Sequence, residues 1–222
     1  MPQQEPRRAA AGAGWQDAGV VGWVLFDYGA VLCTEQPAQD RRALVAAAGI
    51  DPADRLAVRR FWDGYWRDRG PYDRAELEPA AYWARVLERT PGTAEVAALD
   101  RADVAGWCHP QPASLAVAEA LADDGVELAL LSNAPASLAD AVDRLRWMQV
   151  VPRRFYSCRL RATKPDPAAY GGVLAELGAD PAEVTFVDDR PANVAGAAAV
   201  GMRALQFTDP ARLAADLGVE SR

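Results

Sequence analysis

The sequence contains little cysteine and no long apolar run. Its three cysteines, Cys33, Cys108 and Cys158, are far apart in the 222 residues and form no CxxC pair. A zinc site and a disulfide framework are therefore not expected, and a reducing, cytoplasmic setting fits best. No apolar segment has the length of a signal-peptide core or of a membrane span, so we expect no membrane association.

Positive charge is outnumbered, because 24 Lys and Arg face 31 Asp and Glu and the formal net charge is −7. A phosphate backbone would be repelled on average, which argues against nucleic acid as a partner. A small anionic substrate remains open, because a bound cation can reverse the local field. His109 is the only histidine, so a Ser-His-Asp triad would have to use it, and the sequence has no GxSxG motif.

What the sequence does contain is a series of short apolar runs typical of strands buried on both faces. The first is 20–26, and the others are 126–131, 184–187, 203–207 and a shorter one around 155–156. Segments with helical spacing, 115–121, 138–145 and 170–177, lie between the later runs. This alternation predicts an α/β fold in which a Rossmann-like parallel sheet lies between helices.

Helix starts are marked by Asp-Pro-Ala, in which Asp is a good N-cap and Pro suits the first helical position. The motif begins at Asp51, Asp166, Asp180 and Asp209, and we expect a helix after each.

The interval 34–109 has no strand pattern, and we interpret it as an all-helical insert over the mouth of the sheet. Its expected helices are 41–48, 53–68, 74–89 and 93–107. The core then comprises 21–33 and 110–222. Residues 1–20, rich in Ala, Gly, Gln and Pro, are interpreted as a disordered N-terminal extension.

Polar residues stand where ligands bind in open α/β sheets, beyond the carboxyl ends of the strands. They are Asp27, Ser132, Asn133, Asp188 and Asp189, with Lys164 in the loop that leaves the third strand.

Together these residues predict a phosphate site. The carboxylate of Asp27 can attack phosphorus, and Mg²⁺ would be held by Asp27 with one or both of Asp188 and Asp189. Ser132 and Asn133 can bind phosphoryl oxygens, and Lys164 supplies a positive charge against developing negative charge.

The motifs hhhhDxG at 23–29, hhhSN at 129–133, KPDPxxY at 164–170 and hhVDDRPxN at 185–193 resemble, in order and spacing, the haloacid dehalogenase superfamily. The resemblance implies a helical cap formed by the insert, a small phosphorylated metabolite as substrate, and Mg²⁺. It makes Asp27 the nucleophile and a metal ligand, and Lys164 the charge-neutralising lysine. It also implies the Gly29 backbone carbonyl and Asp189 as direct ligands and Asp188 as a supporting one, with the turn 191–193 orienting the loop.

The sequence departs from this pattern at Gly29, where phosphatases of the superfamily usually carry an aspartate that acts as general acid and base. Three interpretations remain open. The first is a working phosphatase, for which a sugar phosphate is one candidate substrate. The second is a slow or non-catalytic protein that binds a phosphorylated ligand or a protein partner. The third is a metal-independent dehalogenase, against which the Asp188-Asp189 pair argues. His109 would replace the missing acid only if the connection folds it toward Asp27.

The segment 61–74 mixes aromatic rings with arginines. One interpretation is that the rings stack on part of the substrate and an arginine binds a second anionic group. The other is that Trp62 and Trp66, four residues apart, form the core of the insert, with Arg67 and Arg69 as ordinary exposed charges.

Overall fold

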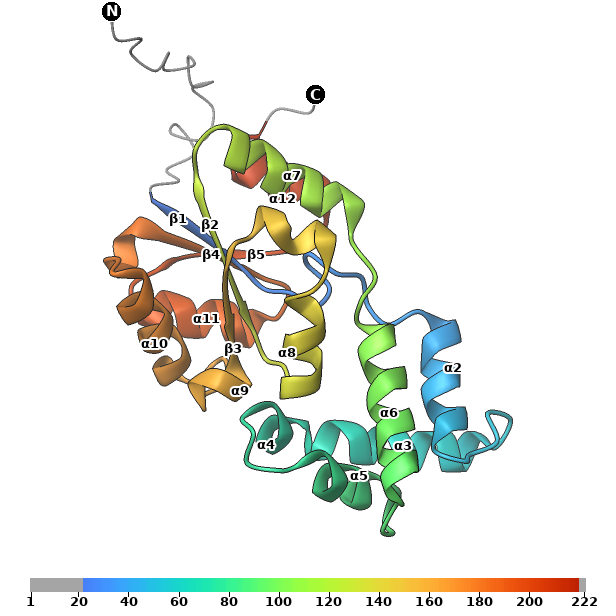
Figure 1. Ribbon diagram of the computed structural model, residues 1–222. Helices are drawn as coiled ribbons and strands as arrows, with labels where there is room; N and C mark the ends of the chain where they lie inside the picture. The colour runs from blue at the N-terminus through green and yellow to red at the C-terminus, as the bar shows by residue number, and fades with distance from the viewer. Residues whose placement is uncertain (1–21, 220–222) are drawn as a thin grey trace, which may run out of the picture.

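The computed structural model describes residues 22–219, so the expected extension 1–20 and the start of the first predicted strand lie outside the described residues. A five-stranded parallel sheet in the order β3-β2-β1-β4-β5 forms the core (Figure 1). Its strands are β1 (Trp23–Phe26), β2 (Glu127–Ser132), β3 (Arg153–Tyr156), β4 (Val184–Asp188) and β5 (Arg203–Gln206). The predicted fold class is therefore confirmed.

Helices cover both faces of the sheet, as the continuous apolar strands require. One face packs on α7 (Pro112–Asp123), α8 (Ala136–Val142) and α12 (Pro210–Asp216), and the other on α10 (Pro167–Leu177) and α11 (Pro191–Ala199). Along β1, Val24 and Phe26 enter the first cluster and Leu25 the second. Shorter helices, η1 (Arg146–Val150), α9 (Ser157–Leu160) and η2 (Pro181–Glu183), join these elements.

The helical insert consists of five helices between β1 and α7 and has a core of its own. They are α2 (Ala38–Ala47), α3 (Arg55–Arg67), α4 (Arg69–Asp73), α5 (Pro79–Leu87) and α6 (Thr93–Gly106). The predicted single helix 74–89 is wrong at its start, because α4 ends at Asp73 and α5 begins only at Pro79. Phe61, Tyr65, Tyr82 and Trp83 fill the centre of the insert.

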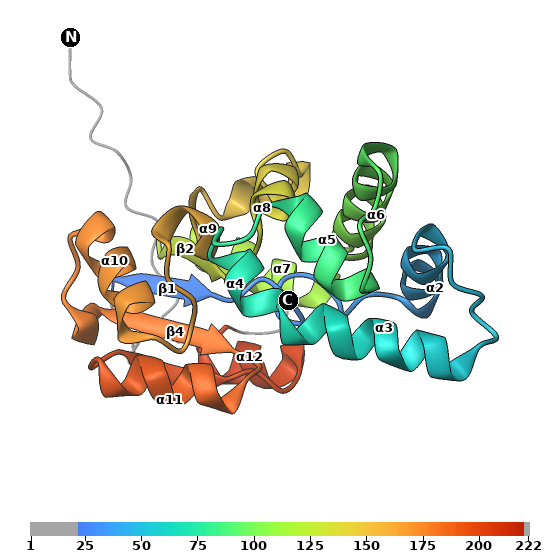
Figure 2. The same ribbon diagram turned by 90° about the horizontal axis from the view of Figure 1, so that it is seen from below.

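Direct hydrogen bonds hold the insert against the core. The Ser157 hydroxyl donates to the carbonyl of Asp73 at 2.7 Å, and the Tyr28 hydroxyl donates to the carbonyl of Trp107 at 2.7 Å. In Figure 2 the arrowheads of β1 and β4 point toward the insert. The carboxyl ends of these strands therefore open into the space between the two units.

The Asp-Pro-Ala signals are correct at three of the four positions. Asp166 and Asp209 cap α10 and α12, and Asp180 caps the short η2. The prediction is wrong at Asp51, which accepts a hydrogen bond from the Ala53 amide in a turn. Helix α3 starts three residues later because Asp54 accepts from the amides of Leu56 and Ala57. None of the helices within 22–219 has the length and apolarity needed to cross a bilayer.

Gly196 on α11 allows this helix to approach the loop that carries Lys164. A Cβ at Gly196 would lie 2.8 Å from the carbonyl oxygen of Pro165 and 3.1 Å from the Tyr170 ring. We predict that Gly196→Ala lowers the free energy of unfolding by about 1–3 kcal/mol, measured by urea denaturation. The control is Gly171→Ala on α10, where nothing lies within 4 Å, so higher helix propensity should add about 0.5–1 kcal/mol. Equal effects of the two changes would contradict the close approach.

Candidate active site

Asp27 extends the β1 ladder by one residue and then turns away from the sheet. Its amide donates to the carbonyl of Val187 at 2.8 Å, and the Tyr28 amide donates to its Oδ1 at 2.6 Å. Ala30 has a φ of 59°, an unusual value for a residue with a side chain, at the point where the loop reverses. The carboxylate of Asp27 is thereby fixed at the carboxyl edge of the sheet.

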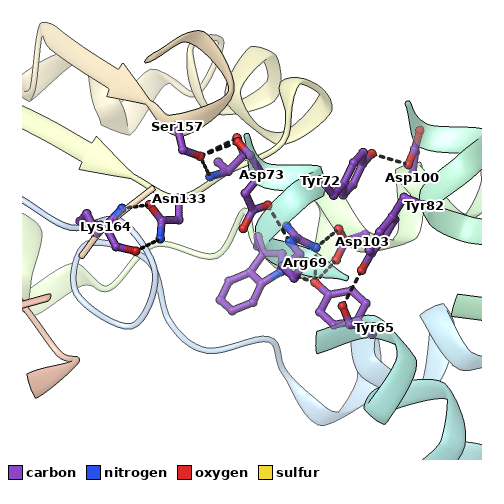
Figure 3. A network of polar contacts seen from close by, with 12 residues as sticks. Tyr65, Arg69, Tyr72, Asp73, Tyr82, Asp100, Asp103, Asn133, Ser157 and Lys164 are labelled. Atoms are coloured by element: carbon purple, nitrogen blue, oxygen red, sulfur yellow. Dashed lines mark hydrogen bonds and ion pairs between the residues drawn. The ribbon is translucent and has the colours of Figure 1, made fainter. Parts of the chain in front are cut away.

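Lys164 binds two carboxylates at once. Its Nζ lies 2.7 Å from Asp27 Oδ1 and 2.7 Å from Asp188 Oδ2, and the side chain is buried. It is the only lysine in the sequence. The Asn133 side chain holds the Lys164 backbone from both sides: Asn133 Nδ2 donates to the Lys164 carbonyl at 2.9 Å, and the Lys164 backbone amide donates to Asn133 Oδ1 at 2.9 Å (Figure 3).

Asp188 is fully buried and its oxygens are saturated with donors. Besides Lys164, it accepts from the Arg190 amide at 2.8 Å, and Asn193 Nδ2 lies 3.0 Å from each of its oxygens. The Tyr170 hydroxyl donates to the carbonyl of Asn193 at 2.7 Å. The turn 191–193 and the KPDPxxY segment therefore hold Asp188, which in turn holds Lys164.

Asp27, Asp188 and Asp189 each place a carboxylate oxygen within 4.8 Å of the others. One buried lysine faces these three carboxylates, which leaves an excess of negative charge that a cation would compensate. The pKa of Asp27 is raised to about 7, mainly by burial and also by the charge of Asp188, while Lys164 opposes the shift. The donor set consists of hard oxygens and fits Mg²⁺. Asp189, half-buried, lines the adjoining cavity, whereas Asp188 does not.

A cavity of about 450 Å³ lies between the insert and the core, within the usual range for ligand sites. Its lining consists of Asp27, Gly29, Ala30, Glu35, Gln36, Arg41, Trp62, Trp66, Arg69, Asp73, Trp107, Asp189 and Arg190. The predicted residues Ser132, Asn133 and Lys164 are not part of this lining. Ser132 and Lys164 are buried, and both polar atoms of the Asn133 side chain are occupied by the Lys164 backbone. One N–H of Asn133 Nδ2 has no partner among the described residues, so contact of this side chain with a phosphate stays a prediction.

The interpretation of Trp62 and Trp66 as the core of the insert is wrong for Trp66, whereas Trp62 is half-buried and packs against that core. Phe61 and Tyr65 point inward instead, while Trp66 is 54% exposed and both tryptophans line the cavity. The two pairs have the same spacing of four, so the spacing alone could not distinguish the inner pair.

The expectation for the two arginines is half correct. Arg67 is exposed, but Arg69 is buried and forms ion pairs of 2.8 Å with Asp73 and with Asp103. Sequence analysis missed this network, which lies within the insert (Figure 3). The only signal for it was the i, i+4 spacing of Arg69 and Asp73. Burial raises the pKa of Asp73 to about 6, while Arg69 opposes the shift.

His109 contacts a carboxylate of the insert. Its Nε2 lies 2.5 Å from Asp40 Oδ2 on α2, and it is not part of the cavity lining. His109 therefore braces the connection between core and insert, as expected of a structural residue, and does not replace the acid missing at Gly29. Cys33 is a buried filler, whose thiol contacts the carbonyls of Thr34 and Trp107.

Comparisons with known proteins identify the family of this chain. Residues 23–201 match the model of the haloacid dehalogenase-like hydrolase family. The match covers most of the chain, so the chain belongs to this family and is a hydrolase.

Two relatives have names of hydrolytic enzymes. A flavin mononucleotide hydrolase of Arabidopsis thaliana is 36% identical over 45% of this chain, a match that spans only 40% of that relative's length. A sesquiterpene phosphatase of Aspergillus oryzae is 27% identical over 83% of this chain and 89% of its own. A Bacteroides thetaiotaomicron family enzyme, solved with magnesium and inorganic phosphate, superposes with a TM-score of 0.66 at 18% identity, covering 85% of this chain and 94% of that one. At this identity the superposition establishes the shared fold.

Proposed function

We propose that the protein is a Mg²⁺-dependent phosphatase that hydrolyses a small phosphomonoester through a phosphoryl group carried on Asp27. The observation that carries the proposal is the Lys164 ammonium fixed between Asp27 and Asp188. The names of the two relatives support it, since both describe the hydrolysis of a phosphorylated compound. A cytoplasmic location is part of the proposal and fits the three free cysteines.

In this proposal Asp27 and Lys164 have different roles in phosphoryl transfer. Oδ1 of Asp27 accepts from the Tyr28 amide and from Lys164, so Oδ2 is left to attack phosphorus. The bond from phosphorus to the ester oxygen breaks in this step, and the alcohol leaves with a proton taken from solvent. Lys164 stabilises the negative charge that develops beside it. Water then attacks phosphorus, releases inorganic phosphate and restores Asp27. Mg²⁺, held by Asp27, Asp189 and the Gly29 carbonyl with Asp188 in support, would supply positive charge to the phosphoryl oxygens.

Gly29 favours a second candidate, a slow or non-catalytic protein that binds a phosphorylated ligand. No carboxyl group at position 29 can protonate the leaving group or activate water, help that is typically worth about 10²–10⁴-fold. The other carboxylates of the cavity outside the metal cluster are Glu35 and Asp73. A metal-independent dehalogenase would have no need for Asp189 beside Asp27.

The phosphatase proposal predicts release of inorganic phosphate from a panel of phosphomonoesters with Mg²⁺ and its loss in EDTA. Asp27→Asn should abolish release, because the neutral amide is a poor nucleophile. Colorimetric phosphate detection measures both results. Full activity of Asp27→Asn would exclude Asp27 as the nucleophile, and no release from any member of the panel would favour the binding protein.

Metal binding can be tested without turnover. Because Mg²⁺ would bind the folded protein, millimolar MgCl₂ should raise the melting temperature of the wild type in differential scanning fluorimetry. Asp189→Asn should remove most of this shift. Asp63→Asn changes an exposed carboxylate on α3 and should leave the shift intact. If Asp189→Asn and the wild type respond equally, Asp189 is not a ligand.

Position 29 has room for a side chain. A Cβ there would meet only a Trp107 ring atom, at 3.5 Å. We predict that Gly29→Asp raises kcat for an ester with a poor leaving group by about 10²-fold, because it supplies the missing acid. Gly29→Asn has a similar size and no acid, so it should not raise kcat. An equal effect of the two substitutions would show that acid catalysis is not what the site lacks.

A further inference from the structure

Trp66 is exposed and lines the cavity. Among residues 22–219 it is one of two large hydrophobic side chains that are mainly exposed, the other being Leu56 at the opposite end of α3. Leu56 does not line the cavity, and Trp66 does. An indole that is left in solvent beside a nucleophile provides apolar area for a ligand to cover.

Three indoles surround the cavity, and Tyr65 holds all of them in place. Its ring packs edge-on against Trp66 at 4.8 Å and against Trp62 at 5.1 Å, and its hydroxyl accepts from Trp107 Nε1 at 3.2 Å. Tyr65 is itself fixed by hydrogen bonds to Asp103 and Arg69. Because the rings are already ordered, little side-chain conformational entropy is lost when a ligand stacks on them.

The polar groups of the cavity are poorly matched to a sugar. Gln36 donates to Asp103, and Asp73 is paired with Arg69, so these side chains are already occupied. Near Gln36 and Asp73, the hydroxyl groups of a sugar ring would lose water and find few free partners.

The charges are equally poorly matched to a plain hydrocarbon. The guanidinium of Arg41 lies 4.7 Å from the centre of the Trp62 ring, and neither Arg41 nor Arg190 has an ion-pair partner within the described part of the chain. A hydrocarbon would strip water from these cations and give no hydrogen bond in return. A flat ring with polar edges can cover the indoles and also accept from Arg41.

We propose that the leaving group of the substrate is a planar aromatic ring system with polar or anionic substituents, which stacks on Trp66 and Trp62 and faces Arg41. This inference rests on the proposed phosphatase function of the same cavity. It assigns Trp66 as a specificity-determining residue that contacts the leaving group and takes no part in phosphoryl transfer.

The test compares kcat/KM for four phosphate compounds: flavin mononucleotide, farnesyl phosphate, glucose 6-phosphate and acetyl phosphate. We expect the wild type to prefer flavin mononucleotide. Trp66→Ala should lower kcat/KM for flavin mononucleotide by about ten-fold, an effect typical of the loss of one stacking contact. Hydrolysis of acetyl phosphate, which has no ring, should stay within about two-fold. Trp66→Phe should keep most of the preference, and Leu56→Ala, which removes the other exposed apolar side chain, should change nothing.

Three outcomes would overturn the proposal: an equal loss on acetyl phosphate, a preference for glucose 6-phosphate, or a preference for farnesyl phosphate that Trp66→Ala removes. If no compound is hydrolysed, acetyl phosphate included, the phosphatase function fails. The proposed stacking on Trp66 is then tested by ligand binding without turnover. Riboflavin, which has no phosphate, should still bind the wild type more tightly than Trp66→Ala by flavin fluorescence quenching, and equal binding would refute the stacking surface.

Discussion

The site depends on one buried ammonium group, that of Lys164, held between the carboxylates of Asp27 and Asp188. Without it, two buried negative charges would face each other with no cation of the chain between them. Asn133 fixes its backbone and Asn193 fixes Asp188, so the ends of β2 and β4 position the same charge. Asp27 is thereby held on one oxygen while the other stays available.

The insert completes the site from the opposite side. Tyr65 connects the Arg69–Asp103 ion pair with the tryptophans that line the cavity, so the same network that stabilises the insert also orients its binding surface. The bond from Ser157 to the Asp73 carbonyl ties this network to the core. The reactive groups thus come from the sheet, and the groups suited to select a leaving group come from the insert.

Sequence analysis recovered the strands and the polar residues at their ends, because apolar β-branched runs and strand-end carboxylates are local signals. It could not decide whether Trp66 lines the cavity or place Arg69 in the interior, since which face of α3 and α4 is buried depends on how they pack against α5 and α6. It also placed a helix start at Asp51, because two aspartates three residues apart compete as caps and only Asp54 reaches the free amides of α3. It could not foresee that the Asn133 side chain binds the Lys164 backbone, because this contact joins two loops that are distant in the sequence.

The central claim is that Asp27 carries the phosphoryl group during turnover. Rapid mixing with substrate and Mg²⁺, followed by acid quenching, peptic digestion at low pH and mass spectrometry, tests it directly. The account predicts a phosphorylated peptide in which Asp27 carries the added group, formed before phosphate reaches its steady-state rate of release and absent from Asp27→Asn. Release of phosphate with no adduct on Asp27, or with an adduct on another residue, would contradict it.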